Sequence, residues 1–576
     1  MLFIIPFVGK SANSEIEKAE QLLSQRNYTA SSALFKNLLR STADRSEKAF
    51  FNLRLAKIAV QTRAFDKAKS YLDSAETQLS TDQIDSLVLD YHLARGILLY
   101  ETENTQEAIW SIELALAQSK KVHGTDSQHY AICLAWLGNI YGHKLFQIPR
   151  SLEYYREAAK SYDLLNAEEK AFLDYNIARV NHTRNDVETS LIYLNRAQPF
   201  YNSHDGYVAE LGDCFNLRGL EFLYKGDTTH FFRNVNEAIR TVENDSIASY
   251  KLAKYYDNMG AVTKFTGNCE ASLAFYKLAL TAAINTKFNL VSLSNTYLNL
   301  GEHYGDCLHK TDSAIYYFKK SLEIRTALYG SKHSEVSAAW LHLAEFYSTG
   351  QSVDSALSFI QQALISEVRA FNSAKLSDNP KTPSDGYGLQ FISILESKSK
   401  HLETKYRQTN DPTYLRYAFQ TLVRADSLLN LVRENFQWDE SRLVYKASLI
   451  SIYNRAFSYG LKLYDLTNQE SVIKTCYYLM ENIRYSLLLD EIKNHDPNDI
   501  KVQLLKKEIF EISNKLSLTP TKGDLSESLS SQLDSTKQSL MTHYERLSGG
   551  ERLLGSTVKR DVFDRTKNLS SILKSG

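Results

Sequence analysis

The chain has 576 residues, of which 43% are hydrophobic and 23% charged, a composition that excludes an intrinsically disordered chain. Lysine plus arginine and aspartate plus glutamate number 67 each, so the net charge gives no argument for binding nucleic acid or an anionic membrane. With only 8 prolines and 23 glycines, the sequence suits a mostly helical protein, because both residues disfavour helix interiors.

The first 13 residues form an apolar segment that ends in small polar residues. Leu2–Val8 is apolar and Ser11–Ser14 is polar, an order that resembles the end of a secretory signal without its charged leader. The run is too short to cross a bilayer, and we expect no transmembrane segment elsewhere. We therefore favour an exported or periplasmic protein over a cytoplasmic one. The alternative is an apolar tail that caps the first folded unit.

One position recurs every 37–43 residues from Ser31 to Ala356, and it is occupied by a small residue in every unit except the sixth, which has Phe231. A large apolar residue follows it by four positions and usually a second small residue by seven, and these offsets share one face of a helix. Another small residue, twelve or thirteen positions earlier, belongs to a preceding helix that packs closely against the first. The small residues of this pattern include Gly96, Ala108, Ala115, Gly138, Ala158, Gly219, Gly260, Ala279, Gly301, Ala314, Ala356 and Ala363. Such a fixed period predicts a solenoid of about nine helix–turn–helix units over residues 14–370.

One unit carries a family resemblance. Tyr256–Gly260, Gly267 and Asn268, then Ser272 and Tyr276, resemble a tetratricopeptide repeat. The resemblance implies an all-α fold: a right-handed α-solenoid of helix–turn–helix repeats, followed here by a helical C-terminal region.

The period is longer than the usual 34 residues or so of that repeat. Units of this length resemble those of the kinesin-light-chain-like subgroup. The segments 121–124 and 327–333 are similar to the loop that connects the repeats of that subgroup.

A stack of helix pairs leaves a concave groove lined by the first helix of each unit. In the tetratricopeptide family, Asn and Lys at such positions often bind a peptide backbone. We predict that the groove binds a peptide or a protein through first-helix residues of units six to eight. These residues are Asp213, Asn216, Lys254, Asp257, Lys264 and Asn295. The alternative is a solvated helix face without a ligand.

The five cysteines are isolated, without a C-x-x-C pair, and we interpret them as small buried hydrophobic residues rather than a disulfide or zinc framework. The 14 histidines include no H-E-x-x-H and no close Cys/His cluster, so we expect no metal site. The motifs G-x-x-x-x-G-K-[ST] and G-x-S-x-G are also absent from the sequence. We therefore predict no catalytic residue and no cofactor.

Proline, glycine and aspartate cluster near residue 380 and predict a linker over 371–388. Helical periodicity resumes over 389–516, where Ala418, Leu422 and Ala425 repeat the spacing of the solenoid and indicate a degenerate repeat. We expect a loosely ordered helix and tail over 517–576.

The segment 389–516 resembles the region that joins tetratricopeptide repeats to a CHAT domain, a caspase-like cysteine protease. The match rests on Asp411–Leu415, Ala425–Leu429 and Tyr478–Glu491. It implies a caspase-like protease or its substrate as partner. However, only about 60 residues follow 516 and no cysteine follows Cys476, so the Cys–His pair of that domain is missing.

We therefore expect a non-enzymatic scaffold that binds a protein or peptide and serves as the sensor or regulatory arm of a CHAT-type protease system. One alternative is a truncated or split CHAT protease whose catalytic domain lies outside this chain. The other is the repeat arm of a bacterial signalling regulator.

Overall fold

The computed structural model describes residues 10–79, 85–145, 147–183, 186–286, 289–348, 352–381 and 389–480 without 436–438, together with isolated positions between 504 and 539. For 427–450 it describes the backbone alone. All regular structure in these residues is helical, which confirms the predicted fold class. Residues 1–9, the linker residues 382–388 and most of the predicted tail 517–576 lie outside the described part.

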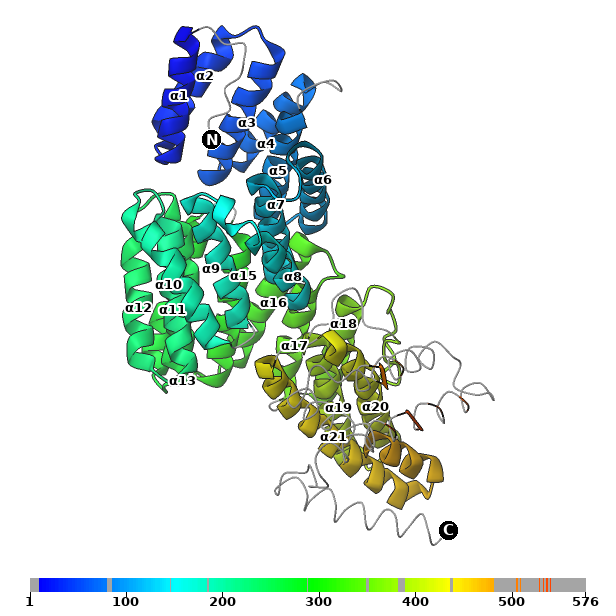
Figure 1. Cartoon of the computed structure of the whole chain (residues 1–576). Helices are drawn as coiled ribbons and strands as arrows, with labels where there is room; N and C mark the ends of the chain where they lie inside the picture. Colours follow the sequence, from blue (N-terminus) through cyan, green and yellow to red (C-terminus); the bar gives the residue numbers. More distant parts are fainter. Residues whose placement is uncertain are drawn as a thin grey trace. The chain divides into compact units, whose positions relative to one another are not determined.

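Up to Glu367, the described helices follow one another as nine pairs, and the two helices of each pair pack against each other (Figure 1). The pairs are α1 (Lys10–Ser24) with α2 (Tyr28–Ser41), α3 (Arg45–Gln61) with α4 (Phe65–Gln78), α5 (Asp85–Glu101) with α6 (Thr105–His123), α7 (Gln128–Asn139) with α8 (Ile148–Ala159), α9 (Ala167–Thr183) with α10 (Val187–Ser203), α11 (Val208–Tyr224) with α12 (Thr228–Val242), α13 (Leu252–Phe265) with α14 (Cys269–Asn285), α15 (Leu290–Asp306) with α16 (Thr311–Tyr329), and α17 (Ser334–Ser348) with α18 (Val353–Glu367). Three short turns, η1 (Ile140–Lys144), η2 (Tyr162–Leu164) and η3 (Ala248–Lys251), extend or connect them.

The repeated small residues form the contact between the two helices of a pair. On the second helices, the small residues at the first and eighth positions of the pattern have no exposed surface, for example Ser272 and Ala279. A Cβ atom added to Gly260 would lie 2.7 Å from the ring of Tyr276, and one added to Gly138 would lie 2.5 Å from Tyr155. In these two repeats the first helix has a glycine where the large residue of the second helix packs against its backbone, and a Cβ atom there would force that residue to move.

In three repeats a serine takes the place of alanine, at Ser31, Ser151 and Ser272, and its hydroxyl donates to a carbonyl of the first helix. Ser272 Oγ donates to the Gly260 carbonyl over 2.8 Å, and Ser151 Oγ donates to the Gly138 carbonyl over 2.6 Å. Each bond joins the two helices of one repeat at the point of closest approach. A buried hydroxyl that is paired in this way costs little free energy, whereas an unpaired one would be destabilising.

The turn inside a repeat stops one helix and starts the next. Gly267 has φ +88°, and the next amide, of Asn268, donates to the Thr263 carbonyl over 3.1 Å, which is the pattern of a Schellman stop. The side chain of Asn268 then accepts from the Ala271 amide and caps α14. Gly226 and Asp227 end α11 and begin α12 in the same way.

Two of the five cysteines correct the expectation drawn from the sequence. Cys269 and Cys307 form a disulfide with a Cα–Cα distance of 5.8 Å. Cys269 begins α14 and Cys307 follows the last residue of the antiparallel α15, so the two helix ends lie side by side. Cys133, Cys214 and Cys476 are buried free thiols.

The chain divides into two compact units, the first comprising Met1–Lys405 with Leu428–Tyr445 and the second Tyr406–Ser427 with Lys446–Gly576. Three long helices follow the repeats: α19 (Leu389–Thr409), α20 (Pro412–Asn435) and α21 (Asp439–Thr467). In the second unit Ala418 is fully buried, and Gly460 closely approaches Cys476 and Phe419. No helix in the described ranges has both the length and the apolar character needed to cross a bilayer.

The described part of the predicted linker is held within the first unit. Gln361 Nε2 on α18 donates to the Ser373 carbonyl over 2.7 Å. Lys398 Nζ on α19 donates to the Asp378 carbonyl over 2.7 Å and to Asn379 Oδ1 over 2.9 Å. Burial lowers the pKa of Lys398 to about 7.

Candidate functional site

A cavity of about 2240 Å³ lies among the first helices of the repeats, within the first unit. The second helices bury their small-residue face inside each pair, which leaves the first helices to form the wall. Residues of α1, α3, α5, α7, α9, α11, α13 and α15 line it. Small-molecule sites usually enclose about 300–1,000 Å³, so a cavity of this volume suits a peptide or a protein segment.

Arg26 closes the first repeat onto the fifth and sixth. Its Nη1 donates to Glu210 Oε1 over 2.8 Å and to the Gly206 carbonyl over 3.2 Å, and its Nη2 lies 3.2 Å from Glu168 Oε1. The guanidinium carbon lies 3.6 Å from the ring centroid of Tyr207. The repeats therefore form a wall that returns to its starting point around the cavity.

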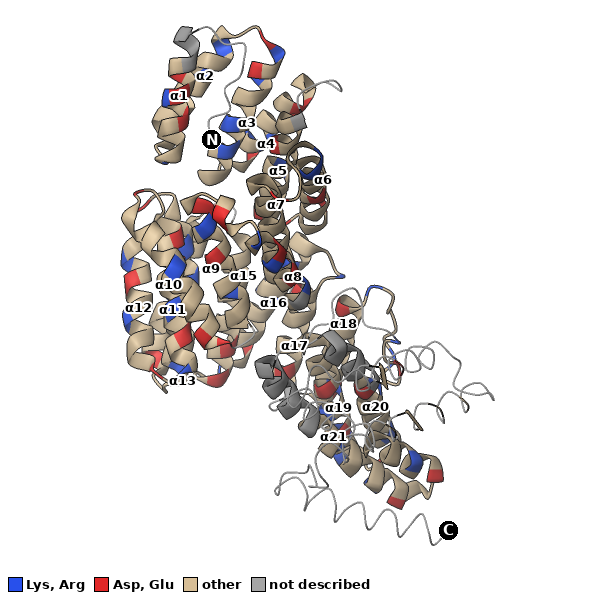
Figure 2. Ribbon diagram, viewed as in Figure 1, with Lys and Arg blue, Asp and Glu red and all other residues tan. Residues whose placement is uncertain are grey.

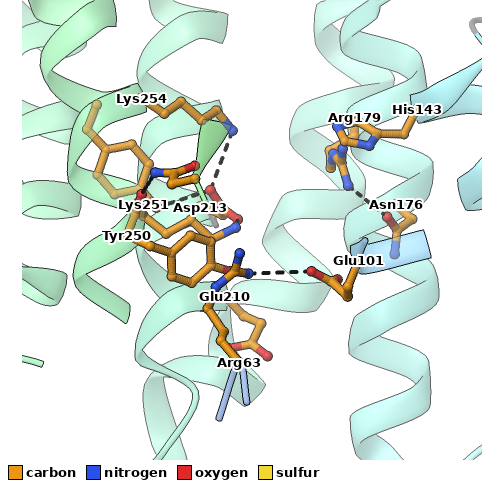
Figure 3. Close-up of polar contacts among 12 residues, drawn as sticks. Arg63, Glu101, His143, Asn176, Arg179, Glu210, Asp213, Tyr250, Lys251 and Lys254 are labelled. Atoms are coloured by element: carbon orange, nitrogen blue, oxygen red, sulfur yellow. Dashed lines mark hydrogen bonds and ion pairs between the residues drawn. The ribbon is translucent and has the colours of Figure 1, made fainter. Parts of the chain in front are cut away.

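Arg63 makes a similar closure in the second repeat. Its guanidinium carbon lies 4.0 Å from the ring centroid of Tyr250, and its Nη1 lies 3.5 Å from Glu101 Oε2 (Figure 3). Arg26 and Arg63 have φ of +54° and +56° at the turn position that Gly226 occupies in the sixth repeat. A left-handed backbone costs a non-glycine residue about 1–2 kcal/mol, and the contacts across the cavity offset that cost.

Four of the six predicted residues line the cavity. Asp213, Lys254 and Asn295 are successively 41 residues apart and occupy equivalent positions on α11, α13 and α15. Asp257 lies one helical turn after Lys254 on α13. Asn295 Oδ1 accepts a hydrogen bond from Arg325 Nη2 over 2.6 Å. That these side chains bind a ligand remains a prediction.

The other two predicted residues do not line the cavity. Asn216 is buried, and its Oδ1 accepts a hydrogen bond from Asn258 Nδ2 over 2.8 Å. Lys264 Nζ lies 2.8 Å from Asp306 Oδ2 and 3.6 Å from Glu302 Oε2, both on α15. Each of these side chains joins α13 to a neighbouring first helix.

Asp213 is the centre of a charged network (Figure 3). Lys251 Nζ bonds to its Oδ2, the Tyr255 hydroxyl donates to its Oδ1 over 3.1 Å, and Lys254 Nζ lies 3.5 Å from the same oxygen. Burial by itself would raise the pKa of Asp213, but Lys251 and Lys254 outweigh it and hold the pKa far below its usual range. Asp213 is therefore ionised at neutral pH.

Asp257 has a buried carboxyl group of which only one oxygen has a hydrogen-bond partner among the described residues. Only 6% of the residue is exposed, and Thr296 Oγ1 donates to its Oδ2 over 2.7 Å. Its Oδ1 has no hydrogen-bond partner among the described residues. Burial raises the pKa of Asp257 to about 7, with the hydrogen bond from Thr296 acting in the opposite direction.

Asp257 predicts a pH dependence of stability. Its pKa is close to 4 in an unfolded chain and about 7 in the folded protein, so the folded state binds the proton more tightly between these values. The free energy of unfolding should then fall as the pH rises from 4 to 7. Relative to Asp257→Asn, which mimics the protonated side chain, we expect wild type to lose about 3 kcal/mol over this interval. Urea unfolding at each pH measures it, and parallel pH profiles of the two proteins would contradict it.

Several polar residues of the cavity were not predicted from the sequence, among them Lys251 on η3, His143 on η1 and Arg179 with Asn176 on α9. The spacing of the repeat pattern could have indicated the turn that carries His143. Gly138 precedes Ser151 by thirteen residues rather than the twelve found in most repeats. The extra residue is taken up by the wide turn η1, which ends where the Leu145 amide donates to the Ile140 carbonyl over 3.3 Å. Such π-helical turns are frequent at functional sites.

Residues 292–364, which span most of α15 to α18, match the model of the tetratricopeptide repeat family. This part of the chain thus has the sequence pattern of tetratricopeptide repeats, as predicted. A comparison with curated proteins gives no match.

One similar solved structure is the apo form of the quorum sensor NprR from B. thuringiensis, with 12% sequence identity and a TM-score of 0.43. The match covers 72% of this chain and 99% of the NprR chain. A Rap protein complexed with Competence and Sporulation Factor has 15% identity, coverage of 73% and 99%, and a TM-score of 0.42. BtubC from P. vanneervenii has 20% identity, coverage of 40% and 91%, and a TM-score of 0.30. These likenesses are too distant to assign a function.

Proposed function

We propose that this chain is a non-enzymatic scaffold whose cavity binds an extended peptide or a segment of a protein partner. The observation that carries the proposal is the row formed by Asp213, Lys254 and Asn295 at equivalent positions of successive first helices in a cavity of about 2240 Å³. An extended peptide presents unpaired N–H and C=O groups at regular intervals. Charged and amide side chains on successive helices can pair with several of these groups.

Donors and acceptors alternate along this wall. Lys254 supplies an ammonium group, while Asp213 on the neighbouring helix α11 supplies a carboxylate. Asn258 and Asn299 also line the cavity, and an amide side chain can both donate and accept. A peptide bond needs one partner of each kind, whereas a simple ion needs only one kind, so this alternation favours a peptide.

Selection from a random peptide display library with the purified full chain tests the proposal. We expect enrichment of a peptide family that Lys254→Ala binds at least about tenfold more weakly, because a hydrogen bond to a charged group contributes about 1.5–3 kcal/mol. Lys264→Ala is the matched control, since Lys264 is a lysine of the same helix that pairs with Asp306 and does not line the cavity. Failure to enrich any peptide, or equal losses in both variants, would count against the proposal.

The resemblance of residues 389–516 to the region before a CHAT domain supports a second, narrower proposal. In it the scaffold serves a caspase-like protease as a regulatory arm. Residues 481–503 and most of 504–516 lie outside the described part, so this proposal depends on the sequence motifs. Co-purification of the tagged full chain with a protein that contains a separated His and Cys would support it, and partners without such a pair would contradict it.

A further inference from the structure

Most charges on the cavity wall neutralise one another. Arg54 lies 2.6 Å from Glu20 and 3.2 Å from Asp90, while Arg63 is paired with Glu101. Basic and acidic residues are correspondingly interspersed along α9–α13 (Figure 2). Side chains that are paired in this way do not require a ligand of a particular charge. A charged residue of the wall without such a partner therefore indicates which charge the ligand carries.

Arg179 on α9 departs from it. Its Nη1 donates to Asn176 Oδ1 over 3.2 Å, and its guanidinium carbon lies 5.6 Å from the ring centroid of Tyr175. No carboxylate of the described residues lies within 4.0 Å of it. The side chain is only partly exposed and faces the cavity. A guanidinium group has five N–H donors, so most of those of Arg179 remain available to a ligand.

Lys254 also lacks a full partner. Asp213 is already bonded to Lys251 and Tyr255, and Lys254 Nζ stays 3.5 Å from the nearer oxygen. Half of the Lys254 side chain, 49%, is exposed inside the cavity. Burial of the charge, with Lys251 and Arg179 nearby, lowers the pKa of Lys254 despite the attraction of Asp213. Lys251 and Lys254 therefore share the carboxylate of Asp213, whereas Arg179 has no carboxylate of the described residues within 4.0 Å.

His143 adds a neutral donor to this region. Burial and the charges of Arg179 and Lys144 hold the pKa of His143 well below its usual value, so the ring is neutral at physiological pH. Its Nδ1 lies 2.9 Å from the Tyr100 hydroxyl. If that hydroxyl donates to Nδ1, the proton of the ring is on Nε2, which can donate to a ligand. Arg179 and His143 lie on one side and Lys254 on the other in Figure 3, and all three side chains line the cavity.

We infer that Arg179, Lys254 and His143 form a subsite for an oxyanion of the ligand, either a carboxylate or a phosphate group. This inference rests on the proposed peptide-binding function and specifies the ligand: its bound segment carries an acidic group. The three side chains offer donors only. An arginine can bind both oxygens of a carboxylate or phosphate, and such charge-assisted bonds are about twice as strong as neutral ones. The bound anion would also balance the excess positive charge beside Asp213.

The first test uses inorganic phosphate as the probe. Calorimetric titration of the full chain at constant ionic strength should show binding in the millimolar range, and Arg179→Gln should weaken it about tenfold or more. Arg179→Lys should recover part of the affinity, because it restores the charge without the planar fork. Lys264→Gln, which alters a lysine outside the cavity, should bind as wild type does. Circular dichroism melts establish that each variant is folded.

Two results of this titration would overturn the inference. One is equal phosphate affinity of wild type and Arg179→Gln, which would place the ion elsewhere on the molecule. The other is no phosphate binding by wild type in the millimolar range. A parallel titration with acetate separates the two possible sources of the oxyanion: tighter binding of acetate favours a peptide carboxylate, and tighter binding of phosphate favours a phosphorylated side chain.

The second test separates this inference from the proposed function. Peptides selected on wild type are resynthesised with each Asp or Glu changed to Asn or Gln. A loss of affinity in wild type that is absent in Arg179→Gln supports the subsite. Unchanged affinity for the amide peptides overturns the subsite while peptide binding itself stands. If no peptide is selected, the proposed function fails, and the phosphate titration still decides whether the oxyanion site exists.

Discussion

Loss of the disulfide between Cys269 and Cys307 is expected to lower the free energy of unfolding by about 4 kcal/mol. The bond closes a loop of 38 residues, and the chain-entropy estimate for a loop of that length gives this value. The disulfide joins the start of α14 to the end of α15. Because α15 carries Asn295, which lines the cavity, the bond also stabilises this part of the cavity wall. Looser packing there would displace this part of the wall.

The measurement is urea unfolding with and without dithiothreitol, on wild type and on a variant carrying both Cys269→Ser and Cys307→Ser. Wild type should lose stability on reduction, and the double variant should start at the reduced value and not respond. Cys133, Cys214 and Cys476 are free thiols in the structure, so they provide no second source of a reductant effect. A transition midpoint that is the same in all four experiments would contradict the prediction.

Ala279→Trp should destabilise the seventh repeat by about 1–3 kcal/mol or more, because the site has no room for a larger side chain. Ala279 has no exposed surface and lies on the face of α14 that also presents Ser272 and Tyr276 to α13. A tryptophan there would have to push the two helices of the pair apart. The loss should appear in the same urea experiment.

Leu278→Trp is the control for this substitution. Leu278 is the preceding residue of α14 and is 47% exposed, so the same side chain can be added there without displacing a neighbour. Its unfolding midpoint should stay close to that of wild type. Equal destabilisation by the two substitutions would mean that the face of α14 assigned to the core is wrong.

The sequence predicted the repeat architecture because the contact inside each pair depends on local spacing. Ala279, Tyr276 and Gly260 had to lie at one interface once the helical period was recognised, and nothing distant in the chain could change that. The disulfide was missed for the opposite reason. Cys269 and Cys307 are 38 residues apart, and their proximity depends on where α14 begins and α15 ends, which no cysteine motif records.

The cavity was predicted only in part. Lys254 could be assigned to its wall from the register of the repeats, but the same register did not separate it from Lys264, which turns to Asp306 instead. Nothing in the sequence around Arg179 distinguishes it from another arginine on a first helix. Its importance comes from the absence of a nearby carboxylate among the described residues, which only the spatial arrangement reveals.

The closure by Arg26 limits how this protein can evolve. Arg26 of the first repeat contacts Gly206, 180 residues further along the chain. Arg63, at the equivalent position of the second repeat, contacts Tyr250, which lies one repeat after Gly206. An open array of repeats can gain or lose a unit by duplication or deletion with little harm, since each unit touches only its neighbours. Here one unit more or less between the second and fifth repeats would bring Arg26 opposite the wrong residue. The contacts of Arg26 and Arg63 across the cavity therefore depend on the number of repeats between them and their partners.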